Sequence, residues 1–463
     1  NQYDSHTIAR TLVQRGFRRV EFRECADLYV IDTCTVTAEA DKKSRKAAGR
    51  ARRNNAEAVV AVTGCAAAYA REQFQRVAPD ALVLDNTRKL ELPELAIAAL
   101  NKRDDWAREY SRLREEIGSE PMPSATRERA VLKIQDGCNH KCSYCIIPSV
   151  RGASVVKSRV AAMQEARELV REGARELSIT GVSMSDWNDE GTGREAPGAG
   201  KKINRDAARV LAPQNKSIPS QRLVPSAGRL SRNAALCDLI RAVSTIEGLE
   251  RVRVSSLDQA DVDDEFLFTL ASTRGFCPHI HLALQSGSAG VLRRMRRRYT
   301  PQMFLRAARR WREIRPDGGL TTDIIVGFPG ETDAEFQETL QLARTAKFSA
   351  IHVFPYSPRA GTVAAELPDH VAPEVQKRRV QTLLQLAREL SAEYAAHFVG
   401  QTLPILVETV SPEGALEGLT PHYVKAQVRA VPGGFAPGDV AWLRAENWDG
   451  EALRGEFAVR RES

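Results

Sequence analysis

Long apolar runs are missing from this sequence, and no stretch approaches the eighteen or so uninterrupted apolar residues of a membrane-spanning helix. The chain also opens without a basic segment followed by an apolar one, so no secretory signal is recognisable. We therefore expect a soluble, cytoplasmic protein with no membrane partner. An initiator methionine is absent too, because the first residue is Asn1, and we expect that the true N-terminus is missing.

The composition is that of an ordinary globular protein, with 43% apolar and 27% charged residues. At 463 residues the chain is too long for one domain, so two or three are expected. The net charge of +8 suits a polyanionic partner, although many modestly basic proteins bind none. Eight cysteines without a secretory signal favour metal or redox chemistry over disulfides.

Helix-like and strand-like segments alternate at the start of the chain and predict a small parallel α/β domain over residues 1–103. The expected helices are 4–15, 38–53 and 91–100, and the expected strands are 27–32, 58–63 and 81–84. Cys34 and Cys65 each follow a predicted strand, at the edge where open parallel sheets place ligands.

A second strand–helix rhythm, after a charged linker at 101–129, predicts a partial (β/α)6 barrel over residues 126–370. The expected strands are 131–135, 176–180, 251–255, 279–284, 320–326 and 350–354. Two helical faces are predicted between them, one of Val160, Met163, Leu169 and Val170, the other of Phe304, Ala307, Ala308 and Trp311. Residues 188–233 hold few large apolar side chains and are predicted to be a disordered insertion.

The remainder of the chain is predicted to be a linking helix at 371–400 and a small β-barrel at 401–463. Short β-like runs at 403–409, 424–430 and 440–446 alternate there with turn residues. The fold class expected overall is α/β, with a small parallel domain, a partial barrel and a terminal β-barrel.

Three cysteines lie close together at the end of the first predicted barrel strand: Cys138, Cys142 and Cys145. Thiolates are the usual ligands of iron–sulfur clusters, and this C-x3-C-x2-C loop supplies three. The fourth iron of a 4Fe–4S cube would stay open to a small chelating molecule. The alternative is a structural zinc site, which needs four ligands. His140 could be the fourth, but it lies inside the tight loop and would be poorly placed.

This loop resembles that of the radical S-adenosylmethionine (SAM) superfamily. The resemblance implies that SAM chelates the open iron and is cleaved, after one electron from the cluster, to a 5′-deoxyadenosyl radical. Further segments resemble one subfamily, the methylthiotransferases, over nearly the whole chain: 32–37, 40–45, 63–65, 284–288, 295–300, 322–331 and 354–359. Asp258 and Gln259 depart from that family's pattern, as does the insertion at 188–233.

In that family three cysteines of the N-terminal domain hold a second, auxiliary 4Fe–4S cluster. Cys34 and Cys65 match two of them, and the third would fall just before Asn1. Cys25 is interpreted as an ordinary buried thiol. The resemblance also implies SAM-lining positions at Ser255, Gln285, Asp323, Gly327 and Gly330. For the two glycines the alternative is a plain turn between a strand and a helix.

The terminal segment 401–463 resembles the TRAM domain, an RNA-binding module, at Gly418, Thr420 and Tyr423. Its aromatic residues are few, so composition alone supports RNA binding only weakly. A basic run, Arg293, Arg294, Arg296, Arg297 and Arg298, could contact phosphates, or it could be a solvated helix face. The RNA-binding candidates are Arg296, Arg297, Arg298 and Tyr423.

The resemblance implies methylthiolation of carbon-2 of the adenosine beside the anticodon in tRNA. Details at 32–45 and the arginines before Tyr299 favour the threonylcarbamoyl-modified adenosine. The auxiliary cluster would deliver sulfur, a second SAM the methyl group, and a flavodoxin or ferredoxin the electrons. No catalytic residue is assigned beyond the cluster ligands. The alternatives are an isopentenyl-adenosine substrate, an aspartate of a ribosomal protein, and a non-catalytic iron–sulfur protein that binds RNA.

Overall fold

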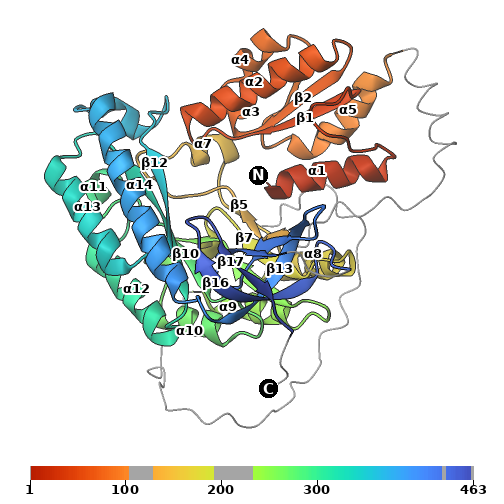
Figure 1. The fold of residues 1–463 in the computed structure, drawn as a ribbon. Coiled ribbons are helices and arrows are strands. Elements are labelled where there is room, and N and C mark those ends of the chain that lie inside the picture. The colour runs from red at the N-terminus through yellow and green to blue at the C-terminus, as the bar shows by residue number, and fades with distance from the viewer. Residues whose placement is uncertain (1, 104–128, 192–232, 430–433, 460–463) are drawn as a thin grey trace.

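The computed structural model describes residues 2–103, 129–191, 233–429 and 434–459. Figure 1 shows the N-terminal part (red and orange) at the top of the view, above a curved central part. The C-terminal strands (dark blue) lie in the middle of the view, below the N-terminal part. Most of the predicted linker at 101–129 and of the predicted insertion at 188–233 lies outside the described residues.

The N-terminal part is a parallel sheet with helices on both faces. Its strands are β1 (Leu28–Thr33), β2 (Val59–Gly64) and β3 (Leu82–Val83), in that order. Its helices are α1 (Gln2–Gln14), α2 (Ala38–Asn54), α3 (Cys65–Tyr69), α4 (Arg71–Val77), η1 (Lys89–Glu91) and α5 (Leu92–Leu100). One apolar cluster joins the sheet to α2, α3 and α4, and another joins it to α1 and α5. The expected parallel α/β unit is confirmed; the short α3 and α4 were not predicted.

The central part has all six predicted strands, and every pairing along its curved wall is parallel. They are β4 (Arg129–Lys133), β7 (Glu176–Thr180), β8 (Arg251–Val254), β10 (His279–Leu282), β11 (Gly319–Val326) and β12 (Ala350–Pro355). The prediction of one strand at 251–255 is wrong in detail. After β8, which pairs with β7, the chain passes Ser255 and forms a short β9 (Ser256–Leu257) that pairs with β10.

Helices cover the outer side of this wall and close one large apolar core against it. They are α8 (Arg159–Arg171), α9 (Ala234–Ser244), α10 (Asp264–Ser272), α11 (Ala289–Arg294), α12 (Pro301–Ile314), α13 (Asp333–Ala346) and α14 (Pro373–Ala396). The face predicted for α12 is confirmed, since Phe304, Ala307, Ala308 and Trp311 are all buried. On α8 the prediction for Val160 is wrong, because this side chain is 78% exposed and Ala162 and Ala166 face the core instead.

The C-terminal part is a closed barrel, which confirms the expected small β-barrel. Its strand order is β13 (Thr402–Val410), β14 (Leu416–Leu419), β15 (Lys425–Val428), β17 (Leu453–Phe457) and β16 (Val440–Trp448). The short strands β14 and β17 were not predicted, and each carries a glycine that weakens a strand pattern. No helix among the described residues is both long and apolar enough to cross a membrane.

This small barrel closes the amino end of the central strands. Arg251 at the start of β8 donates to the carbonyl of Leu419, and Arg253 donates to that of Thr420. Both arginines lie beside Glu176, which is buried and pairs with Arg253 at 2.8 Å. The two ends of the central strands are therefore in different surroundings, with the cysteine loop at the carboxyl end and the small barrel at the other.

Candidate metal centre and SAM site

The cysteine loop is a compact structure at the carboxyl end of β4. Strand β5 (Gln135–Asp136) pairs antiparallel with β6 (Val155–Val156), so the chain between them returns on itself. Cys138 N donates to Gly152 O at 3.1 Å and closes the base of the loop. Gly137 has a φ of +72°, and a Cβ there would lie 2.1 Å from Ala153 O, so only glycine fits. The loop thereby holds all three cysteines within one fixed turn of the chain.

The three thiols suit a cluster better than a single zinc ion. Burial raises the pKa of the Cys138 thiol, and it raises that of Cys145 to about 11, so these groups need a cationic partner to become thiolates. The sulfurs of Cys138, Cys142 and Cys145 do not all lie within 4.8 Å of one another. A tetrahedral zinc ion would bring its ligand atoms to about 3.8 Å from one another. His140 does not join them, because its Nε2 lies 3.2 Å from Ser183 Oγ and 3.3 Å from Arg298.

Arg297 belongs to this loop and not to an exposed basic face, so its assignment to RNA phosphates does not fit its place in the structure. Its side chain is 8% exposed, donates to Cys142 Sγ at 3.3 Å and pairs with Asp258 at 2.8 Å. Burial disfavours its charge, but the surrounding acidic groups outweigh this and raise the pKa of Arg297. A fixed cation therefore lies against one cysteine of the triplet. Asp258, which departs from the family pattern, holds it in place.

The second pair of cysteines is brought together by strand register. Thr33 pairs with Gly64, so Cys34 and Cys65 each directly follow the end of one of two neighbouring strands. Gly64 has a φ of +96°, and a Cβ there would lie 2.4 Å from Thr33 O. The Thr33 hydroxyl accepts from Ala66 N and Ala67 N, which fixes the first turn of α3 and with it Cys65. The pair lies at the carboxyl edge of the sheet, as the sequence predicts.

These two cysteine sites face each other across the contact between the N-terminal and central parts. Cys65 packs in one apolar cluster with Ile146 and Val150, and Ile146 directly follows Cys145 in the chain. Helix α7 (Ile147–Arg151) completes the contact, because Arg151 Nε donates to Cys65 Sγ at 3.3 Å. A group bound at Cys65 would therefore lie next to the loop that carries the triplet.

A buried charge network joins the same two parts. Asp4 of α1 pairs with Lys89 and Lys133, and Asp136, two residues before Cys138, pairs with Lys89, Lys133 and Arg151. Burial opposes ionisation of Asp136, but the three cations outweigh it and hold its pKa well below the usual range. The sequence alone does not reveal this network, because its five charged residues are scattered between positions 4 and 151 and form no motif.

Two of the predicted SAM-lining residues have unusual backbone surroundings. Gln285 is in the left-handed region with a φ of +63°, which costs free energy in a residue with a Cβ and marks sites of function. Its N and O bond Asp323 O and Ile325 N, so it lies at the carboxyl side of β10 and β11. Ser255 lies at the break between β8 and β9, with its Oγ 2.8 Å from Thr180 Oγ1.

The other three predicted SAM-lining residues have protein partners. Gly327 N donates to buried Glu331, and a Cβ at Gly327 would meet Gln376 of α14. Gly330 N donates to Asp369 O. These contacts are those of a turn packed on α14 and on the segment just before it, which is the alternative stated for the two glycines. Asp323 faces His281, with Oδ2 3.3 Å from Nε2.

The predicted RNA contacts and Cys25 complete the comparison. Arg296 is exposed, and Arg298 is 42% exposed but pairs with Asp261 at 2.7 Å. Tyr423 is 42% exposed, stacks on His279 at 4.4 Å between ring centroids, and helps to close the central barrel. The interpretation of Cys25 as a buried thiol is wrong, since it is exposed in the loop between α1 and β1.

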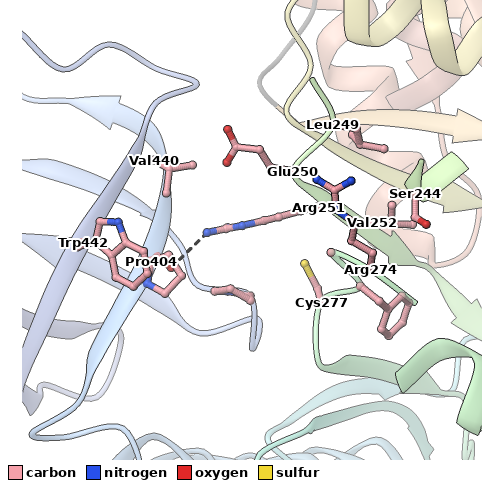
Figure 2. A pocket seen from close by; sticks show the side chains of 13 residues that line it. Ser244, Leu249, Glu250, Arg251, Val252, Arg274, Cys277, Pro404, Val440 and Trp442 are labelled. Carbon is pink, nitrogen blue, oxygen red and sulfur yellow. Dashed lines mark hydrogen bonds between the residues drawn. The ribbon is translucent and has the colours of Figure 1, made fainter. Parts of the chain in front are cut away.

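A cleft of about 620 Å³ lies between the central part and the small barrel (Figure 2). Arg251 and Cys277 form one wall, and Pro404, Val440 and Trp442 form the other, with Arg251 bonded across to Pro404 O. The cleft opens at the amino end of the central strands. Parallel barrels carry their chemistry at the carboxyl end, so this cleft is separate from the SAM site.

Comparison with known proteins agrees with this geometry. Residues 132–343 match the family described as the radical SAM superfamily, and residues 1–85 match an uncharacterized protein family, UPF0004. The protein is therefore a radical SAM enzyme, which uses SAM and a 4Fe–4S cluster. A radical SAM methyltransferase from Kitasatospora setae with cobalamin and a cluster bound has 14% identity and a TM-score of 0.49, over 78% of this chain and 73% of that one.

Two relatives are named threonylcarbamoyladenosine tRNA methylthiotransferase. The one from Bacillus subtilis is 32% identical over 92% of this chain and 87% of its own, and the one from Thermotoga maritima is 30% identical over 92% and 88%. A tRNA-2-methylthio-N(6)-dimethylallyladenosine synthase from Mycolicibacterium paratuberculosis is 34% identical over 88% and 74%. The chain belongs to the radical SAM methylthiotransferase family.

Proposed function

We propose that this enzyme adds a methylthio group to carbon-2 of the threonylcarbamoyl-modified adenosine beside the anticodon in tRNA. The observation that carries the proposal is the packing of Cys65 against Ile146 and Val150, beside the loop of the triplet. Sulfur held on the N-terminal part would then lie next to the place where SAM is cleaved. The names of the relatives from Bacillus subtilis and Thermotoga maritima support the choice of substrate.

Cys138, Cys142 and Cys145 would hold the first 4Fe–4S cluster, which supplies the electron that cleaves SAM. Cys34 and Cys65 would hold the auxiliary cluster together with a third thiolate. Ser5 Oγ on α1 donates to Asp32 Oδ2 at 2.7 Å. The first turn of α1 therefore lies close to the end of β1, which Cys34 follows.

The chain's own residues would orient the cofactor and the thiolates. Gln285 and Ser255 would line the SAM site, and Gly327 and Gly330 would shape the turn beside it. Arg297 and Arg151 would each donate a hydrogen bond to one cysteine sulfur, Cys142 and Cys65 respectively. Asp323 is left out of the SAM site, because its carboxylate faces two histidines.

The tRNA would approach the carboxyl end of the central strands. Arg293 and Arg296 are exposed there, and Arg298 reaches His140 of the cysteine loop. In the proposed division, residues 1–103 hold the auxiliary cluster, 126–370 carry out SAM chemistry, the helix at 371–400 links them to 401–463, and this last part binds RNA through its TRAM-like surface. Reduction by a flavodoxin or ferredoxin in the cytoplasm completes the proposal.

The chemistry is tested by incubating the protein anaerobically, with both clusters reconstituted, with SAM and dithionite. We expect 5′-deoxyadenosine as the product. Its absence would leave the non-catalytic RNA-binding alternative. Mass spectrometry of tRNA nucleosides from a deletion strain tests the substrate. We expect loss of the methylthio-threonylcarbamoyl nucleoside, restored by the wild-type gene but not by one encoding Cys142→Ala.

One observation favours a second candidate substrate. The mycobacterial relative is 34% identical, slightly more than the two threonylcarbamoyl relatives, and its name specifies dimethylallyladenosine. Overall identity therefore does not separate the two branches. Loss of the methylthio-isopentenyl nucleoside in the deletion strain, with the threonylcarbamoyl form intact, would replace our proposal with this one.

A further inference from the structure

A second group of metal-ligating side chains lies on three central strands that carry no cysteine. His281 on β10, Asp323 on β11 and His352 on β12 each offer one ligand atom, and these atoms all lie within 4.8 Å of one another. Strand register explains the group. His281 pairs with Thr321 and Asp323 pairs with His352, so the three residues occupy neighbouring positions across three adjacent strands.

These side chains point to the inner side of the curved wall. Side chains alternate along a strand, and the flanking residues Ile280, Leu282, Ile324 and Ile351 all belong to the core between the wall and its outer helices. His281 and Asp323 are partly buried, with 12% and 28% of their side chains exposed, and His352 is exposed. The group is therefore enclosed on the β10 side and open on the side of β12, which is the last strand of its sheet.

The orientation of His281 is fixed by a second layer of hydrogen bonds. Its Nδ1 lies 3.0 Å from Thr321 Oγ1, and the same hydroxyl lies 2.9 Å from Nε2 of His279. This leaves Nε2 of His281 directed at the group. That atom is buried and makes no hydrogen bond to any described residue, and its 3.3 Å contact is with Asp323 Oδ2, another member of the group. Metal-binding histidines are held in this way, with one ring nitrogen bonded to the protein and the other free for the ion.

The donor set specifies the class of ion. Two imidazole nitrogens and one carboxylate suit zinc, iron and related divalent transition metals, whereas magnesium and calcium prefer oxygen alone. The nearby cation Arg253 does not oppose such an ion, because its charge is balanced by buried Glu176 at 2.8 Å. With Asp323, the group presents one carboxylate and two imidazole nitrogens to an ion.

We propose that His281, Asp323 and His352 bind one divalent transition-metal ion of the zinc class, in addition to the iron–sulfur clusters. Three protein ligands leave a coordination position for an oxygen ligand, and the exposure of His352 opens that position to the interior of the barrel. The site is independent of the proposed tRNA substrate, because it rests on the three side chains alone. The competing interpretation is a group of hydrogen-bonded side chains that holds no ion.

The experiment uses the full chain with its clusters reconstituted anaerobically. The protein is dialysed against micromolar Zn²⁺, and zinc and iron are counted by mass spectrometry. We expect one zinc per chain in the wild type and in the control variant His397→Ala, which removes an exposed histidine at the end of α14. The variants His352→Ala and Asp323→Asn should lose this zinc and keep their iron, which also shows that they fold.

Two further measurements exclude binding elsewhere. X-ray absorption at the zinc edge should show nitrogen and oxygen neighbours at about 2.0–2.1 Å and no sulfur at about 2.3 Å. The variant Thr321→Val removes the hydroxyl that orients His281, and zinc affinity should fall by about 10- to 100-fold. Wild-type protein that takes up no zinc, zinc that stays in His352→Ala and Asp323→Asn, or sulfur neighbours around the zinc would each overturn the proposal.

Discussion

Replacement of Arg297 tests whether the protein tunes its SAM-cleaving cluster through one hydrogen bond. Arg297 donates to Cys142 Sγ at 3.3 Å, pairs with Asp258 at 2.8 Å and lies over the ring of Tyr299 at 4.9 Å. A cluster gains negative charge on reduction, so a cationic donor to its sulfur stabilises the reduced form more than the oxidised form. Arg297→Met should therefore lower the reduction potential.

The magnitude follows from the strength of such a bond. A hydrogen bond to a charged group contributes about 1.5–3 kcal/mol. Since about 1.4 kcal/mol corresponds to 59 mV for one electron, the loss should lower the midpoint by roughly 60–130 mV if the whole bond discriminates between the two redox states. Arg297→Lys keeps a charge but not the forked donor, so its shift should be smaller.

A redox titration followed by electron paramagnetic resonance measures this shift. The background Cys34→Ala/Cys65→Ala removes the proposed auxiliary site, so the measured signal is that of the cluster at the triplet. Removal of Arg297 also leaves Asp258 with only its 3.9 Å contact to Arg298, so the double variant Arg297→Met/Asp258→Asn separates that effect from loss of the donor. The iron content of the variant must equal that of the wild type. A midpoint potential of Arg297→Met within roughly 20 mV of the wild-type value would then refute the reasoning, because 59 mV corresponds to a tenfold change in a one-electron equilibrium constant.

Three further predictions concern stability. The pKa of Asp136 is depressed, so its network stabilises the fold fully above the ordinary carboxyl pKa of about 3.9. Below that pH the contribution declines progressively, and it is lost only as the pH passes the much lower pKa of the folded state. Asp136→Asn should therefore lower the urea midpoint strongly at pH 7 and by a smaller but still measurable amount at pH 3, and a larger loss at pH 3 than at pH 7 would contradict this. Arg359→Met breaks a buried pair with Asp41 across the N-terminal contact, should cost about 3–5 kcal/mol, and should speed proteolysis of the N-terminal part. Tyr423→Ala should lower the melting temperature through loss of stacking on His279, worth about 0.5–1.5 kcal/mol, while Tyr423→Phe should not.

Sequence reasoning located most elements because each has a strong local signal. The six parallel strands follow from short apolar runs at regular spacing, and the cysteine triplet from its motif. The break at Ser255 has no such signal. It arises because the chain changes its pairing partner there, from β7 before Ser255 to β10 after it. The prediction for Val160 is wrong because the face of α8 that packs on the core is formed by Ala162, Ala166 and Leu169, and small alanines give a weak apolar signal.

The surroundings of the site could not be predicted from local patterns. Arg297 lies in a run of arginines that reads as one basic face, yet five neighbouring side chains separate into exposed, paired and buried positions. Its burial depends on Asp258, thirty-nine residues away. His281, Asp323 and His352 are likewise distant in sequence and meet only through strand register. Contacts of this kind depend on tertiary structure, which the sequence does not display.

The two arginine–sulfur contacts have a common physical consequence. Arg151 reaches Cys65 and Arg297 reaches Cys142, and each arginine is also held by an aspartate, Asp136 or Asp258. Each cation is therefore oriented before any cluster binds, so little side-chain entropy is lost when a thiolate forms. Because Arg151 contacts both Cys65 and the strand that leads into the triplet loop, a shift of the N-terminal part would alter both sites together. The docking of that part, and not the cysteine motif alone, therefore sets the electrostatic surroundings in which sulfur is transferred.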